Sequence, residues 1–260
     1  MNLAYSVAGL LVGILVGLTG VGGGSLMAPI LILFFGFNPA VAIGTDLWFA
    51  AITKSVGGLI HRRVGSPDWQ VIRRLALGSV PAAVVTLVWL KVFHQGRLDA
   101  DVLFILLGIA LLLTAAVMPF KDKLRSPLIE LRRKLGPSLR RRQFWCTVVS
   151  GAAVGALVTI TSIGAGALVA VLLMMLYPLR LDTRTVVSTD ILHAIPLALV
   201  AAIGQSWLGN VDMSLLAMLL LGSIPGIIIG SLIAGKIDER LIRYILAAML
   251  AISGFKLLTA

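Results

Sequence analysis

Cysteine, histidine and acidic residues are scarce in this chain of 260 residues. The single cysteine, Cys146, excludes an intrachain disulfide and a cysteine-based metal cluster. The three histidines lie far apart, without the spacing of metal ligands, and the sequence contains no phosphate-binding loop and no nucleophile elbow. We therefore expect neither an enzyme nor a bound cofactor.

Charge of either sign is scarce as well. Charged residues make up 13% of the chain, whereas about a quarter is typical of soluble domains. The 22 Lys and Arg residues outnumber the 11 acidic ones, which gives a formal net charge of +11. Most of these basic residues lie between apolar runs, where they orient a protein in a membrane. We therefore expect no nucleic-acid partner.

Apolar residues take the place of the missing charge. They account for 59% of the chain, the mean hydropathy is +1.04, and apolar runs cover nearly the whole length. This composition predicts an all-α polytopic membrane protein whose main partner is the lipid bilayer. The N-terminus lacks the basic region of a cleaved signal peptide, so we expect mature structure from Leu3 onward.

A glycine-rich break interrupts the first apolar segment. Gly20 and Gly22 to Gly24 separate the runs Leu3 to Gly17 and Leu26 to Phe37, and a spanning helix needs about 20 apolar residues. We expect two half-helices that meet at an unwound turn, which survives at membrane depth only inside protein or beside a wet cavity. The free N–H groups that open the second half-helix form an anion site.

The same pattern returns in the second half of the chain. Residues 13–26 align with 155–168, Thr45-Asp46 aligns with Thr189-Asp190, and 77–81 aligns with 221–225. The sequence thus predicts a first repeat over 1–120 and a second over 144–260, joined by a basic loop at 121–143. Secondary transporters are often built from two such halves, with the substrate site between them.

Charge placement favours one membrane topology. If each broken segment is a re-entrant hairpin, nearly all Lys and Arg residues outside the membrane share one side with the basic loop, as the positive-inside rule prefers. The loop is then cytoplasmic and contacts anionic lipid. Each half contains three crossings, so the two repeats are inverted. The alternative is that each broken segment crosses the membrane once. The expected helices besides the broken segments cover about 39–60, 75–93, 102–120, 186–207, 213–234 and 241–258.

Two intramembrane acids occupy equivalent places in the repeats. Asp46 and Asp190 are interpreted either as proton carriers or as caps for unwound backbone, because a charge at this depth needs a partner or a function. Lys54 shares a helix face with Asp46, whereas its counterpart in the second half is Ala198. His193, three residues after Asp190, is either a proton shuttle or a simple hydrogen-bonding group.

The candidate substrate-binding residues combine hydroxyl groups and backbone N–H groups near the two breaks with the intramembrane acids. Such a set binds an oxyanion without a full positive charge and so permits its release. The set is Thr19, Gly22, Gly23, Gly24, Ser25, Thr45, Asp46, Thr161, Ser162, Gly164, Gly166, Thr189, Asp190 and His193.

Several motifs occur together in an order that is typical of one family. They are Gly17-Leu18-Thr19-Gly20-Val21-Gly22-Gly23-Gly24 with Pro29, Gly44-Thr45-Asp46, Gly78-Ser79-Val80-Pro81, and later Gly164-Ala165-Gly166, Ser188-Thr189-Asp190 and Gly222-Ser223-Ile224-Pro225-Gly226. With these motifs, nearly the whole chain resembles the TauE/SafE family of sulfite exporters, also called the TSUP family.

The resemblance implies a secondary transporter for sulfite, sulfoacetate or other organosulfonates in the bacterial inner membrane, working by alternating access. A channel-like anion facilitator and a membrane-embedded factor without transport activity are the alternatives. Protons are a candidate coupling ion through Asp46, Asp190 or His193. The sequence leaves open the direction of transport and the formation of a homodimer.

Overall fold

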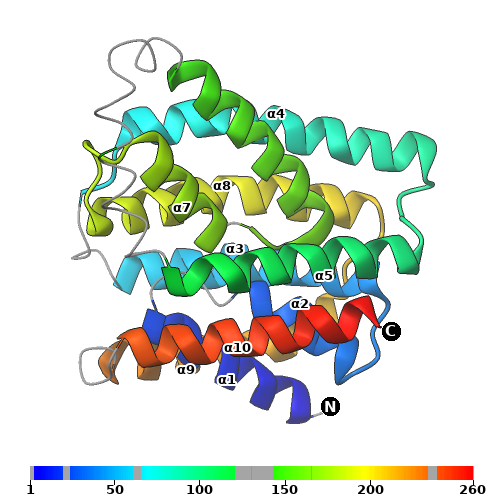
Figure 1. Cartoon of the computed structure of the whole chain (residues 1–260). Coiled ribbons are helices and arrows are strands. Elements are labelled where there is room, and N and C mark those ends of the chain that lie inside the picture. Colours follow the sequence, from blue (N-terminus) through cyan, green and yellow to red (C-terminus); the bar gives the residue numbers. More distant parts are fainter. Residues whose placement is uncertain are drawn as a thin grey trace.

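The computed structural model describes residues 3–19, 24–60, 66–120, 130, 143–164, 166–233 and 239–259. All regular secondary structure in these residues is helical (Figure 1), which confirms the predicted all-α class. The predicted basic loop at 121–143 lies outside the described residues, apart from Glu130 and Gln143.

The helices follow the predicted order along the chain. They are α1 (Leu3–Thr19), α2 (Gly24–Leu33), α3 (Pro39–Ile60), α4 (Trp69–Phe93), α5 (Ala100–Val117) with the short 3₁₀ helix η1 (Met118–Phe120), a helix over Gln143–Thr161, α7 (Ala167–Leu176), α8 (Thr183–Trp207), α9 (Met213–Ile233) and α10 (Glu239–Leu258).

Six of the described helices are long and apolar enough to cross a membrane. They are α4, α5, Gln143–Thr161, most of α8, α9 and most of α10. α3 has 22 residues and contains Asp46 and Lys54, and it is not among these six. The second broken segment therefore begins with a helix of spanning length, whereas α1, with 17 residues, is shorter.

α4 begins at Trp69, before the predicted start at Leu75. The carboxylate of Asp68 accepts hydrogen bonds from the N–H groups of Gln70 and Val71, at 3.1 and 3.2 Å, and so caps the helix. The helix thus includes Arg73 and Arg74, which the apolar pattern alone had placed ahead of it.

Each glycine-broken segment turns back on itself. In the first, the ring of Tyr5 in α1 packs edge-on against Phe35 and Phe37, which follow α2, with ring centroids 5.0 and 5.7 Å apart. In the second, the Gln143 amide donates to the Leu176 carbonyl at 2.6 Å. Each segment therefore begins and ends at the same end of the bundle.

The two hairpins pack against helices of the opposite half. α1 runs parallel to α9, and a Cβ added to Gly13 would lie only 2.7 Å from Ser223 Cα. The helix Gln143–Thr161 runs parallel to α4 in the same way, with a Cβ on Gly155 2.7 Å from Ser79 Cα. Equivalent glycines thus make equivalent close contacts, with the halves of the chain exchanged.

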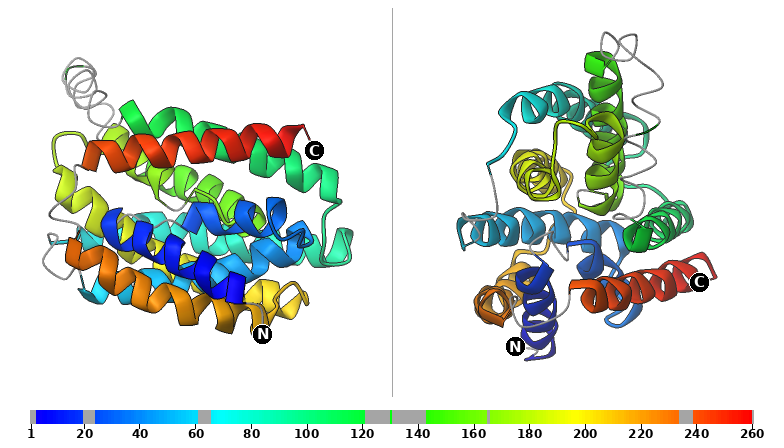
Figure 2. Two further views of the ribbon diagram at one scale, coloured as in Figure 1. Left: turned by 90° about the horizontal axis from the view of Figure 1, so that it is seen from below. Right: turned by 60° about the vertical axis from the view of Figure 1, so that its left-hand side comes forward.

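α3 and α8 form the centre of the bundle and run antiparallel. The indole N–H of Trp48 donates to the Ser206 hydroxyl at 2.8 Å, while Gly58, toward the other end of α3, faces the Ile191 side chain. The pairs α1 with α9 and α4 with Gln143–Thr161 lie on either side, and α5 packs on α10 (Figure 2). This arrangement places the polar residues of α3 and α8 in the interior.

Candidate functional site

The carboxylate of Asp46 lies in the interior of the bundle, fully buried on α3. Ser162, from the second break, and Ala28, from α2, lie beside it. Neither carboxylate oxygen makes a hydrogen bond of good geometry with the described residues, and the same holds for the buried hydroxyl of Ser162. Buried polar groups are normally saturated, so this pair has bonding capacity left for a ligand.

Lys54 and Asp190 lie in the same interior. Lys54 is 5% exposed and Asp190 is fully buried, and the ammonium group is within electrostatic range of the carboxylates of both Asp46 and Asp190. The structure therefore places one ammonium group within reach of both acids that the sequence predicted at equivalent places. The basic residue that interacts with both comes from the first half alone, because its counterpart is Ala198.

His193 is fully buried on α8. Its Nε2 lies 2.8 Å from the hydroxyl of Ser79 on α4, and its Nδ1 has no hydrogen-bond partner among the described residues. Ser79 was not predicted from the sequence as the partner of His193, although it stands in the repeated Gly-Ser-x-Pro motif. At the equivalent serine, Ser223, the pattern differs, because Phe49 occupies the position equivalent to His193.

The hydroxyls of Thr45 and Thr189 face helix starts of the opposite half. Thr45 accepts a hydrogen bond from the backbone N–H of Asp212 at 3.1 Å, and Thr189 accepts one from the N–H of Asp68 at 3.0 Å. Both threonines are fully buried. They tie α3 to the start of α9 and α8 to the start of α4, a role that the sequence pattern does not indicate.

The described part of the second break comprises residues 162–164 and Gly166. Ser162 and Gly164 have positive φ angles of 57° and 114°, and the Thr161 hydroxyl, which donates to Leu157 O at 2.7 Å, accepts the Ile163 N–H at 3.1 Å. Gly166 precedes α7 and has no side chain to cap the helix. The first N–H groups of α7 therefore remain available to an anion.

Less of the first break is described. The Thr19 hydroxyl donates to the Leu15 carbonyl at 2.8 Å, as in an ordinary helix end. Gly22 and Gly23 lie outside the described residues, while Gly24 and Ser25 form the first turn of α2.

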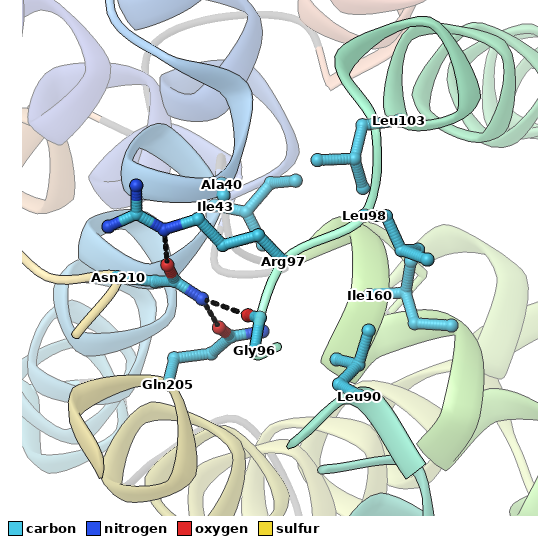
Figure 3. Close-up of a pocket in the computed structure, with 10 residues that line it drawn as sticks. All are labelled: Ala40, Ile43, Leu90, Gly96, Arg97, Leu98, Leu103, Ile160, Gln205 and Asn210. Carbon is cyan, nitrogen blue, oxygen red and sulfur yellow. Dashed lines mark hydrogen bonds between the residues drawn. The ribbon is translucent and has the colours of Figure 1, made fainter. Parts of the chain in front are cut away.

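A polar network near the ends of α4 and α8 was not predicted from the sequence. It surrounds a cavity of about 10 Å³ (Figure 3). Asn210 accepts a hydrogen bond from Arg97 at 2.7 Å and donates to Gln205 at 2.9 Å, and Gln205 donates to the Thr159 carbonyl at 3.0 Å. The network thus links an exposed loop to the helix that precedes the second break.

The opposite end of the bundle carries an ion pair. Arg180, in the loop before α8, binds both carboxylate oxygens of Asp68, at 2.6 and 3.0 Å. The equivalent acid at the other end, Asp212, instead accepts from the Ser214 hydroxyl at 2.6 Å. This hydrogen bond lowers the pKa of the Asp212 carboxyl.

A scan of the chain against protein-family models matches "Sulfite exporter TauE/SafE" over residues 5–257. The chain belongs to the TauE/SafE family. This TauE/SafE protein is 38% identical to the probable membrane transporter YjnA of Bacillus subtilis, over 99% of its own length and 100% of YjnA. It is 28% identical to the probable membrane transporter YdhB of the same organism, over 95% of its length and 96% of YdhB. No solved structure matches it.

The family assignment and the helical structure indicate the same class of protein. The protein is a multi-pass membrane transporter and not an enzyme. Its interior site joins polar groups from α3, α8 and the second break, inside a bundle whose buried residues are mostly apolar.

Proposed function

We propose that this protein is a secondary transporter of small sulfur-containing anions, such as sulfite, sulfoacetate and other organosulfonates. The observation that carries the proposal is the match of residues 5–257 to the sulfite exporter family. The membrane is the bacterial inner membrane, with the basic loop 121–143 on the cytoplasmic side, in contact with anionic lipid.

The second break supports the anionic character of the substrate. It offers the uncapped start of α7 and the buried Ser162 hydroxyl, which makes no hydrogen bond of good geometry with the described residues. Helix N-termini and hydroxyl groups bind oxyanions through charge-assisted hydrogen bonds. Without an arginine or lysine directly at the break, binding stays weak enough for release.

The equivalent contacts that each hairpin makes with the opposite half of the chain support alternating access between two inverted repeats. Each hairpin is held by glycine contacts to the other half, and the two hairpins open at opposite ends of the bundle. In a pair of inverted repeats, each half can adopt the conformation of the other, and this opens the site to the opposite side of the membrane. The substrate site then faces each side in turn.

The test is charge movement in proteoliposomes after rapid addition of sulfite, sulfoacetate, sulfate and taurine in turn. We expect a saturable current with sulfite or sulfoacetate. Taurine, a zwitterion without net charge, serves as the control for the sulfonate group alone. If neither sulfur anion gives a current or uptake of radiolabel by folded protein, the proposal is wrong.

A channel-like facilitator is the second candidate, since the interior contains polar groups along α3 and α8. The two functions differ in kinetics. A transporter saturates and exchanges labelled for unlabelled substrate across the membrane, whereas a channel conducts without such obligatory exchange. Counterflow in the same proteoliposomes distinguishes them.

A further inference from the structure

Four acidic or basic side chains are buried in the described interior: Asp46 and Lys54 on α3, and Asp190 and His193 on α8. α1, α2 and α9, which also pack on α3, carry no acidic or basic residue, and the one on α5 is Asp101, in its first turn. α4, which packs on α8, carries Arg73, Arg74 and Lys91, none of which is buried. The interior charge is therefore set by these four groups.

Lys54 stands near the midpoint between the two acids. Because α3 and α8 run antiparallel, with Trp48 bonded to Ser206 and Gly58 facing Ile191, Asp46 and Asp190 lie toward opposite ends of the central pair. Lys54 follows Asp46 by two helical turns and interacts with the charges of both acids. One ammonium group thus interacts electrostatically with two carboxylates.

With His193 neutral, the ionised cluster carries a net charge of minus one. A bound anion would make it more negative, and each uncompensated charge in a membrane interior costs at least a few kcal/mol. The carboxylate of Asp46 lies beside Ser162 of the second break and makes no hydrogen bond of good geometry with the described residues. It is therefore placed to accept a proton when an anion arrives at the break.

We propose that Asp46, Lys54 and Asp190 form a proton-coupling site, at which the anion binds together with at least one proton and both cross in the same direction. The proposal rests on the proposed function and adds the coupling ion to it. Asp46 takes up the proton beside the anion, and Lys54 then pairs with the remaining carboxylate of Asp190. Each proton taken up thus offsets one negative charge of the bound anion.

The first experiment measures binding, which does not require turnover. Sulfoacetate, which stays ionised near neutral pH, is titrated into purified protein by calorimetry in two buffers of different ionisation enthalpy. The difference gives the protons taken up per anion bound. We expect about one for the wild type and for the control Asp101→Asn, and a value near zero for Asp46→Asn. Asp190→Asn provides a second variant should Asp46→Asn fail to fold.

The second experiment measures transport with the membrane potential clamped at zero. A gradient of one pH unit should then accumulate sulfoacetate about tenfold for each coupled proton. Lys54→Met, which removes the positive charge, should shift the pH dependence of counterflow toward more acidic pH, since further protons must replace it.

Three outcomes separate the claims. Wild-type binding and counterflow without any proton uptake overturn the coupling site but leave the transport function intact. Unchanged proton uptake in both Asp46→Asn and Asp190→Asn overturns the assignment to these residues. Absence of both sulfoacetate and sulfite counterflow in the wild type refutes the proposed function itself, and the coupling proposal with it.

Discussion

At the scale of single residues, Ser162 combines a positive φ angle of 57° with a buried hydroxyl that makes no hydrogen bond of good geometry with the described residues. A hydrogen bond from such a hydroxyl to a charged ligand is worth about 1.5–3 kcal/mol. Ser162→Ala should therefore lower kcat/KM for the transported anion at least about tenfold.

Ser55→Ala is the matched control for this substitution. The Ser55 hydroxyl donates to the Ala51 carbonyl of its own helix at 2.7 Å, so its loss should leave transport nearly unchanged. Equal effects of the two substitutions would remove Ser162 from the binding site.

Asp212 provides a pH-dependent contribution to stability. Its hydrogen bonds with Ser214 and Leu215 lower the pKa of the carboxyl below its ordinary value of 3.8. The folded state is therefore stabilised at pH values above the unfolded pKa, and this contribution is lost as the pH falls through the folded pKa. Asp212→Ala should cost about 1 kcal/mol of stability at neutral pH, and the difference should shrink below about pH 3.

Thermal unfolding in detergent at neutral and acidic pH measures this effect. Asp101→Ala, in the first turn of α5, is the control for removal of an acidic residue near a helix start. A difference between wild type and Asp212→Ala that stays constant with pH would refute the stabilising role of the ionised Asp212 carboxyl.

At the scale of elements, the glycines of α1 determine how closely it packs on α9. A Cβ on Gly13 would lie 2.7 Å from Ser223 Cα, whereas one on Gly58 would make an ordinary contact of 3.5 Å with the Ile191 side chain. Small residues allow such close backbone approach between membrane helices. Gly13→Ala and Gly155→Ala should each cost about 1–3 kcal/mol by overpacking, while Gly58→Ala should be neutral or stabilising.

Melting temperatures of the three variants in detergent decide this prediction. If Gly13→Ala and Gly58→Ala have the same melting temperature, α1 and α9 can separate slightly at little cost. The close packing of the hairpin is then not what holds the halves together.

Helix positions were largely predictable from the sequence, because long apolar runs bounded by Pro, Gly and charged residues leave few alternatives. α3 covers Pro39–Ile60 as expected. The start of α4 was missed, since the Asp68 cap extends the helix over residues whose charge resembles a loop. The internal repeat gave the equivalence of Gly13 with Gly155, but not their partners, because an alignment of two halves does not say which half packs on which.

The sequence also predicted two acidic residues in the interior of the bundle. Asp46 and Asp190 stand out because a charge in an apolar helix is costly, and both are buried near Lys54. The hydroxyls of Thr45 and Thr189 were interpreted as ligand groups, yet they accept backbone N–H groups from Asp212 and Asp68. Such bonds join residues more than a hundred positions apart, so no local pattern reveals them.

At the scale of the whole molecule, the two ends of the bundle are closed by different interactions. Arg180 and Asp68 form a two-point ion pair at one end, while Arg97 donates to the neutral Asn210 at the other. If the halves move during transport, Arg180→Ala should favour the state that is open at the ion-paired end. An exposed ion pair contributes up to about 1 kcal/mol, so the two populations should shift by up to about fivefold.

Sided kinetics measure this shift. The apparent KM of Arg180→Ala should fall for substrate added at the ion-paired end and rise for substrate added at the other. Arg184→Ala, an exposed arginine in the first turn of α8, is the control. Equal KM changes on both sides would show that the ion pair stabilises the fold without acting as a gate.

The central claim is that this TauE/SafE protein exchanges small sulfur-containing anions across a membrane. Counterflow tests it most directly, because exchange of labelled for unlabelled substrate needs no knowledge of the coupling ion or the direction of transport. Proteoliposomes loaded with unlabelled sulfite or sulfoacetate should accumulate the labelled anion transiently, with saturation, and taurine should not compete. Linear entry without an overshoot would indicate a channel, and no entry of either anion would contradict the account.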